Sequence, residues 1–298
     1  MNGVLIVNKP LGYTSRDIVN KVGKILNTKK IGHTGTLDPN ASGVLVLCIG
    51  KALKMCELIN GDKEYIATVI LGIETDTLDL DSNATVIKEK DVHISNQEII
   101  DAVNFFKGKY MQEVPKYSAV KVNGHKLYEY ARNNIDVELP KKEVNIKNIK
   151  ILDDIKNDNG KISFKIKCTV SKGTYIRALI RDIGKKMGVP AVMKDLVRTK
   201  IDNFTINDSF SIEDIENNNY RIIDIIDAFS DIPLIKVNDS VAFKVKNGVI
   251  LDKFFDSNIA FIADKNNQLI ALYKNIDNES RPYKMFVNLS IESRHKKF

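Results

Sequence analysis

The sequence predicts an α+β fold, because strand and helix patterns are mixed along its 298 residues without strict βαβ alternation. Some segments alternate apolar and polar residues with a period of two, which is typical of half-buried strands. Others repeat apolar residues every three or four positions, as helices do. After residue 233 the pattern changes to short strands separated by turn residues, which indicates a second, β-rich domain.

The first part of the chain alternates between the two patterns. Residues 4–7 are a short apolar run typical of a strand, and the segment 14–26 begins with helix-capping residues and continues with apolar residues at helical spacing. Residues 31–43 are rich in Gly, Thr, Asn and Pro and are predicted to form a structured loop. A buried strand at 44–49 and a short helix at 52–58 follow.

The middle of the chain predicts a strand, a helix, a long excursion and a hairpin. Ser95 opens a capping box ahead of a helical face that continues to residue 106. The remaining predicted elements are a strand at 65–71, the excursion at 108–136 with a short helix at 126–132, hairpin strands at 144–152 and 162–170 around a turn at 157–160, and helices at 174–187 and from 211. Residues 234–290 are expected to form short strands, and the domain boundary is placed at 230–235.

Composition is that of an ordinary globular protein, with 43% hydrophobic and 28% charged residues. The apolar run 44–49 is far shorter than the ~20 residues of a membrane helix. The N-terminal residues do not show the pattern of a secretory signal. Cys48, Cys56 and Cys168 are scattered and have neither disulfide-framework nor metal-site spacing, so we expect a reducing cytoplasm.

Charge is zoned along the chain. Lys and Arg exceed Asp and Glu by 45 − 38 = +7, and the excess gathers at 107–126 and 161–177. Acidic residues gather at 74–91 and 211–240. The basic segments fit either a solvated surface or a face that binds RNA or DNA.

Residues 32–39 are the first candidate for chemistry, because they combine two glycines, small hydroxyls, His33 and Asp38. Asp38 precedes a proline, and it is either a turn initiator or a reactive acid. His33 is either an acid–base group or a loop histidine that is hydrogen-bonded to the backbone. The sequence lacks the phosphate-loop and dinucleotide glycine patterns and the paired His or Cys spacing of a metal site.

Two further candidates lie in other segments. Arg177 falls one turn inside a predicted helix, where it either lies on the surface or pairs with a carboxylate. Tyr65 begins an apolar strand and is either a core aromatic or a site residue.

Six motif segments occur along the chain: NKPLGYTS (8–15), GHTGTLDPNASGVLVLCIGKALK (32–54), DKEYIATVILGIETDTLD (62–79), VPKYSAVKVNGHKLYEYAR (114–132), SKGTYIRALIRDIG (171–184) and LVRTKI (196–201). In this order they resemble the motifs of the TruB family of bacterial tRNA pseudouridine-55 synthases. Residues 32–54 are similar to the family's central signature. The resemblance is dense over residues 1–210 and weaker beyond.

The resemblance implies a function and a nucleophile. The family isomerises uridine to pseudouridine in the T-arm loop of tRNA, and it uses neither a cofactor nor a metal. By the match, Asp38 is the nucleophile, Arg177 pairs with it, and Tyr65 stacks on the flipped uracil and assists proton transfer.

The same match assigns supporting roles to five more residues. Tyr175 and Leu196 line the base pocket, and His33 occupies the space that the flipped base leaves. Lys9 and Pro10 support the catalytic loop structurally.

The resemblance also implies an architecture and a partner. A catalytic domain at 1–232, with a mixed, largely antiparallel sheet flanked by helices, would carry an RNA-clamping insertion at about 108–136. Residues 233–298 would form a small β-rich, PUA-like RNA-binding domain. The expected partner is the T-arm stem-loop of tRNA, bound by a cytoplasmic monomer without an obligate protein partner or membrane.

Two alternatives remain. A guide-RNA-dependent rRNA pseudouridine synthase shares the aspartate loop but lacks the insertion, so residues 114–132 favour the stand-alone enzyme. A non-catalytic protein that binds or folds tRNA would not need Asp38 and its matching partners.

Overall fold

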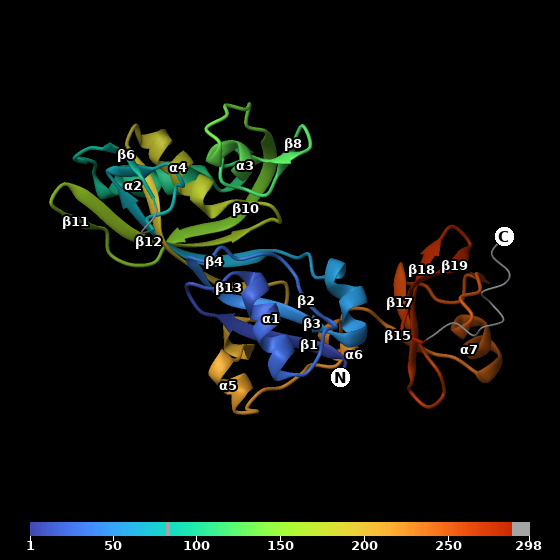
Figure 1. Cartoon of the computed structure of the whole chain (residues 1–298). Helices are drawn as coiled ribbons and strands as arrows, with labels where there is room; N and C mark the ends of the chain where they lie inside the picture. Colours follow the sequence, from blue (N-terminus) through green and yellow to red (C-terminus); the bar gives the residue numbers. More distant parts are fainter. Residues whose placement is uncertain (82–83, 288–298) are drawn as a thin grey trace.

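The computed structural model describes residues 1–81 and 84–287 and contains two main sheets (Figure 1). Strands between residues 3 and 205 form a ten-stranded sheet, and strands between residues 234 and 285 form a five-stranded sheet. Helices flank both sheets. The predicted α+β class and the β-rich C-terminal part are thereby confirmed. No helix in the described ranges is long and apolar enough to cross a membrane.

The larger sheet is mixed and largely antiparallel, as expected. Its central path contains seven strands in the order β1 (Gly3–Lys9), β3 (Ala41–Ile49), β13 (Ala191–Ile201), β4 (Lys63–Leu71), β12 (Lys161–Val170), β10 (Lys141–Ile151) and β7 (Gly108–Glu113). β13 pairs with β3 in parallel, whereas the other neighbours on this path are antiparallel. Three short strands pair at its margins: β2 (Ile31–His33), β11 (Lys156–Asp158) and β14 (Phe204–Thr205).

Strand β13 is central to this sheet, but the sequence pattern indicates only its end, as the motif at 196–201. It pairs with β3 on one side and with β4 on the other. Register shifts against β4 occur between Met193 and Asp195 and between Arg198 and Lys200. Such bulges break the period of two on which strand prediction depends, so the pattern hides the strand.

The predicted helix start at Thr14 and the predicted capping box at Ser95 are confirmed, and both α1 and α2 begin with a capping box. Thr14 accepts a hydrogen bond from the backbone N–H of Asp17, and Ser95 accepts one from Glu98, with both carboxylates bonded back to the cap backbone. The other helices are α3 (Leu127–Arg132), α4 (Ile176–Met187), α5 (Ile212–Glu216), α6 (Ile225–Ala228), α7 (Asp239–Lys246) and the 3₁₀ helices η1 (Gly50–Leu58) and η2 (Ile206–Asp208), beside α1 (Ser15–Ile25) and α2 (Asn96–Phe105).

Several predicted boundaries need correction. Part of the predicted loop 31–43 is strand, because β2 ends at His33 and β3 begins at Ala41. The short helix predicted at 52–58 is a 3₁₀ helix that starts at Gly50. The predicted strands 234–290 include α7, which Asn238 caps by accepting a hydrogen bond from Val241; residues 288–290 lie outside the described range.

The smaller sheet and two hairpins complete the fold. The smaller sheet has the order β15 (Leu234–Lys236), β17 (Ile259–Ala263), β18 (Leu269–Ile276), β19 (Glu279–Met285), β16 (Leu251–Asp252). Outside both sheets, β5 (Ile73–Thr75) pairs with β6 (Val86–Glu89), and β8 (Lys121–Val122) pairs with β9 (His125–Lys126). In Figure 1, β8 and α3 of the insertion lie together beyond the end of β10.

Apolar residues pack on both faces of the larger sheet. In β1, Val4 and Ile6 join one buried cluster, whereas Leu5 and Val7 join another that includes α1. This alternation is the expected result of burying a strand on two faces. The first cluster also contains Phe261 and other C-terminal residues, so the two sheets share an apolar contact.

Candidate active site

A cavity of about 510 Å³ opens where the 34–40 loop, the start of α4 and the insertion meet. Five of the residues singled out in the sequence line it: Asp38, Tyr65, Tyr175, Arg177 and Leu196. They come from the loop before β3, from β4, from the start of α4 and from β13. A volume of this size is typical of pockets that bury a small molecule or a part of a larger one.

The loop that carries Asp38 is held at its base by Ser15 and Lys9. Ser15 Oγ accepts from the N–H of Leu37 at 2.9 Å and donates to the carbonyl of the same residue at 3.2 Å. Lys9 Nζ donates to the carbonyls of Tyr13 at 2.7 Å, Pro10 at 3.0 Å and Pro39 at 3.4 Å. These bonds satisfy a fully buried ammonium group and tie the loop to β1 and α1.

Burial lowers the pKa of Lys9 to about 8, although Asp38 opposes the shift. Pro10 contributes its carbonyl to Lys9, and its ring is exposed. Lys9 therefore holds the loop, and Pro10 accepts one of the hydrogen bonds of Lys9. Neither residue lines the cavity.

Arg198 is a third anchor of the loop, and it is not among the site residues predicted from the sequence. Its guanidinium is fully buried and donates to the carbonyls of Val44 at 2.8 Å, Gly35 at 3.1 Å and Thr36 at 3.4 Å. The close approach requires a glycine at position 43, where a Cβ would lie 2.2 Å from the Arg198 carbonyl oxygen. An arginine inside a predicted core strand could have been a signal, but that strand was not predicted.

Asp38 forms an ion pair with Arg177, with 3.1 Å between Oδ2 and Nη2. The Asp38 side chain is 47% exposed, whereas that of Arg177 is 10% exposed. Arg177 also donates to the carbonyls of Thr77 at 2.9 Å and Tyr117 at 3.2 Å. Because these two backbone carbonyls fix the guanidinium, it can hold the Asp38 carboxylate in one orientation while the exposed part of Asp38 stays open to the cavity.

A second carboxylate, Asp79, lies close enough to Arg177 and Asp38 for their charges to affect its pKa. It is not among the site residues predicted from the sequence. It is 4% exposed, and its Oδ1 has no hydrogen-bond partner among the described residues. Burial raises the pKa of Asp79 to about 6, with Arg177 acting in the opposite direction. In the sequence, the acidic segment 74–91 that contains Asp79 indicates only a local excess of negative charge.

Asp79 should make stability depend on pH. Since its folded pKa of about 6 exceeds its ordinary value of 3.8, the native state binds the proton more tightly, and the wild type loses stability as pH rises through this interval. Asp79→Asn should therefore be more stable than wild type at about pH 8, by up to about 3 kcal/mol, and nearly equal at about pH 4. Urea unfolding at both pH values measures this difference. A variant that is equally or less stable at the higher pH would contradict the burial argument.

Tyr65 and Tyr175 both line the cavity. Tyr65, in β4, is 7% exposed, and burial raises the pKa of its hydroxyl, so it is neutral near pH 7. Tyr175 precedes α4, and its peptide is clamped by Gln112: its N–H donates to Oε1 at 2.8 Å and its carbonyl accepts from Nε2 at 3.1 Å. Burial also raises the pKa of Tyr175. Leu196 is 7% exposed and adds an apolar wall.

His33 lies apart from this lining. It belongs to β2, opposite Leu47 of β3, and is absent from the residues that line the cavity. Its Nδ1 is buried and has no partner among residues 1–81 and 84–287. Burial, followed by the charges of Arg16 and Arg198, lowers the pKa of His33, so the imidazole is neutral near pH 7.

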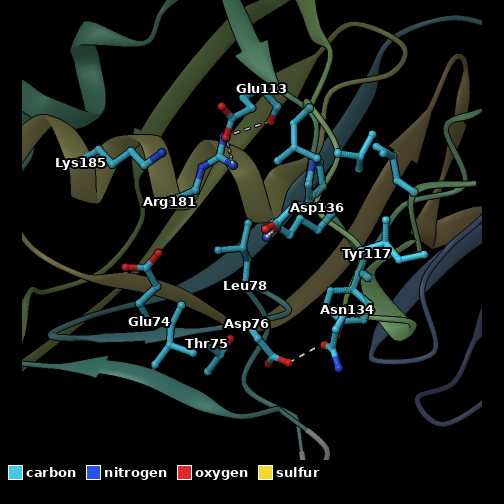
Figure 2. Close-up of a pocket in the computed structure, with 18 residues that line it drawn as sticks. Glu74, Thr75, Asp76, Leu78, Glu113, Tyr117, Asn134, Asp136, Arg181 and Lys185 are labelled. Carbon is cyan, nitrogen blue, oxygen red and sulfur yellow. Dashed lines mark hydrogen bonds and ion pairs between the residues drawn. The ribbon is translucent and has the colours of Figure 1, made fainter. Parts of the chain in front are cut away.

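A second cavity of about 510 Å³ lies under the insertion (Figure 2). Tyr117 lines both cavities. In the second, Arg181 of α4 donates to the Glu113 carboxylate at 3.2 Å and to its carbonyl at 3.0 Å, which fastens the start of the insertion to the helix that carries Arg177. Among the described residues, no group of three or more His, Cys, Asp or Glu could hold a metal ion.

Comparison with known proteins connects this site to a family. The "TruB family pseudouridylate synthase (N terminal domain)" matches residues 23–176, and the "tRNA pseudouridylate synthase B C-terminal domain" matches residues 177–227. The chain is 44% identical to "tRNA pseudouridine synthase B" of Geobacillus kaustophilus (strain HTA426) over 84% of this chain and 91% of that protein. It is 41% identical to the protein of the same name from Bacillus cytotoxicus (strain DSM 22905 / CIP 110041 / 391-98 / NVH 391-98), over 97% and 98%.

Solved structures agree on the fold. The chain is similar to a chain of the "Structure of H/ACA RNP bound to a substrate RNA containing 2'-deoxyuridine", with a TM-score of 0.68 at 24% identity over 96% of this chain and 85% of that one. A chain of the "Crystal Structure of a Cbf5-Nop10-Gar1 Complex" gives 0.67 at 24% identity, over 96% and 84%. At this identity the likeness concerns the fold alone. The family matches and the extent of the sequence identity show that this chain belongs to the TruB family of pseudouridylate synthases.

Proposed function

We propose that this protein isomerises uridine to pseudouridine at position 55, in the T-arm loop of tRNA. The observation that carries the proposal is the half-exposed Asp38 carboxylate, held by the fixed Arg177 guanidinium at the edge of a cavity with aromatic and apolar walls. Its relatives named tRNA pseudouridine synthase B cover most of the chain at more than 40% identity, which supports the same substrate class.

The chemistry needs a nucleophile and proton transfer. The bond between C1′ and N1 of the base breaks, a bond between C1′ and C5 forms, and the C5 proton is lost while N1 gains one. The reaction is an isomerisation with no net oxidation. Asp38 serves as the nucleophile, because a carboxylate can attack carbon and later leave. Arg177 orients it, and an orientation set before the substrate arrives costs no reorganisation during the reaction.

The walls of the cavity suit a uracil that has left the helical stack. Tyr65 stacks on the base and assists proton transfer, and Tyr175 and Leu196 close the pocket around it. A stacked base gives no access to C1′, so the nucleotide must flip, at a cost of a few kcal/mol. His33, next to the loop but outside the cavity, then occupies the space that the base leaves.

Binding to the T-arm depends on the basic segments 107–126 and 161–177, which neutralise phosphates and recognise the stem-loop mainly by shape. The catalytic domain spans residues 1–232, with its clamping insertion at about 108–136. Residues 233–298 form a PUA-like domain that adds RNA contacts. The protein works as a monomer in the cytoplasm, where its tRNA substrate is present, without an obligate protein partner.

The test is incubation with an unmodified tRNA transcript, followed by mapping of pseudouridine at single-nucleotide resolution. We expect modification at position 55 without added metal or cofactor. A transcript with cytidine at that position is the matched control and should stay unmodified. Pseudouridine that appears elsewhere in tRNA, or only when a guide RNA is supplied, would refute the proposed specificity.

A further inference from the structure

A groove of about 500 Å³ runs along α1, outside the cavity described above. Its charged lining residues, Arg16, Lys24 and Lys29, are all basic and all exposed. The remaining lining is polar or apolar: Val19, Asn20, Gly23, Asn27, Thr28 and Ile31. Neither basic segment discussed above contains these residues.

The local sequence builds this groove from one face of α1 and the turn that follows. Residues 16, 20, 23, 24 and 27 recur at the spacing that places helix residues on one face. After α1, Asn27 adopts a left-handed conformation with φ of 48°, and the N–H of Thr28 donates to the carbonyl of Gly23 at 2.9 Å. A Cβ at Gly23 would lie 3.0 Å from the Thr28 carbonyl oxygen, so glycine permits the close return of the chain.

The groove begins beside the catalytic loop. Ser15 bonds to both backbone groups of Leu37, and Arg16 is the next residue. Arg16 also lies close enough to His33 to help lower its pKa. From Arg16 to Lys24 the helix rises about 12 Å, so the basic side chains lead away from the place where the target nucleotide would flip.

Within residues 1–81 and 84–287, no acidic side chain pairs with these three groove charges. Among the described residues, Arg16, Lys24 and Lys29 form no ion pair, whereas Lys21 of the same helix pairs with Glu216 at 3.1 Å. Residues 16–30 hold five basic residues and one acid. That acid, Asp17, is engaged in the cap of α1 through Thr14.

We propose that this groove binds the phosphate backbone of the RNA strand that flanks the target uridine. The proposal rests on the proposed function, which places a flipped nucleotide at Asp38. Unpaired arginine and lysine side chains suit phosphate oxygens, and the asparagine and threonine side chains add neutral donors. The contact is independent of base identity, and it holds the strand in register with the catalytic loop.

The experiment compares two double variants in binding an isolated T-arm stem-loop RNA. Lys24→Gln/Lys29→Gln removes two groove charges. Lys150→Gln/Lys156→Gln removes two exposed lysines from β10 and β11 and is the matched control. Dissociation constants are measured over a range of salt concentrations, and thermal melting checks that each variant is folded.

For the groove variant we expect the dissociation constant at low salt to rise at least about tenfold, with the control unchanged. The slope of log affinity against log salt should fall by about 1.5, since each lost phosphate contact contributes about 0.7 to 0.9. Neither lysine lines the cavity that contains Asp38, so weaker binding by this variant would not come from damage to that cavity.

Three results would overturn the proposal: affinity equal to that of the control, weaker binding with an unchanged salt slope, or weaker binding to whole tRNA but not to the stem-loop. Failure of the proposed function is a separate outcome. In that case the wild type would form no pseudouridine, whether or not the variants bind the RNA more weakly.

Discussion

Asp38→Asn is expected to lower the rate of pseudouridine formation by at least about 10⁴-fold, the scale on which enzymes lose activity when a nucleophile is removed. Asparagine keeps the size of the side chain but cannot attack carbon as a carboxylate does. The loop should keep its shape, because Ser15, Lys9 and Arg198 hold it through backbone groups that the substitution leaves in place. Affinity for tRNA should therefore change by no more than a few fold.

Release of tritium from 5-labelled uridine in T-arm RNA measures this rate, and filter binding measures the affinity. Asp62→Asn is a matched control, since that carboxylate pairs with Lys147 and lies outside the cavity lining. Normal tritium release by Asp38→Asn would refute its assignment as the nucleophile. Equal losses in both variants would show that the assay reports general damage.

Arg177→Met should reduce the single-turnover rate by about 10² to 10³-fold, the usual effect of removing one preorganised electrostatic group. Methionine fills similar space but cannot hold the Asp38 carboxylate or bond to the Thr77 and Tyr117 carbonyls. The dissociation constant for tRNA should change much less than the rate, because Arg177 is almost fully buried.

Arg177→Lys separates charge from geometry. Lysine keeps the positive charge but lacks the planar fork that reaches three acceptors, so we expect a rate between those of Arg177→Met and wild type. Rapid-mixing measurements at saturating RNA compare the three proteins. A single-turnover rate for Arg177→Met equal to wild type would show that the ion pair does not contribute to the chemical step.

Much of the local structure follows from short-range sequence signals. Thr14 and Ser95 start helices where the helix-capping residues at 14 and the capping box at 95 predict them. The hairpin predicted around 157–160 is present, with β11 and β12 joined through Asn159 and Gly160, both at positive φ. These features depend on residues that are close together in the chain, so the pattern alone contains the information.

Strand β13 and helix α7 are two elements that the sequence patterns did not predict. β13 is bulged and carries charged residues, one of which, Arg198, is buried because carbonyls from a distant loop satisfy it. α7 is only eight residues long and lies among strands, so its helical spacing is brief. Long-range contacts override the local signal in β13, whereas in α7 the local signal is present but short.

By itself, the sequence determined the α+β class, the family resemblance and five of the residues that line the cavity, because each is encoded in residue type and order. The tertiary structure decided that Asp38 and Arg177, far apart in the chain, meet at 3.1 Å. It also decided that Arg198 and Gln112 hold segments of the site and that Asp79 is buried within the influence of Arg177. His33, in contrast, lies outside the cavity. The physical reason is that the pairing of β13 with β3 and β4 brings separate segments together, and burial then determines which polar groups must find partners.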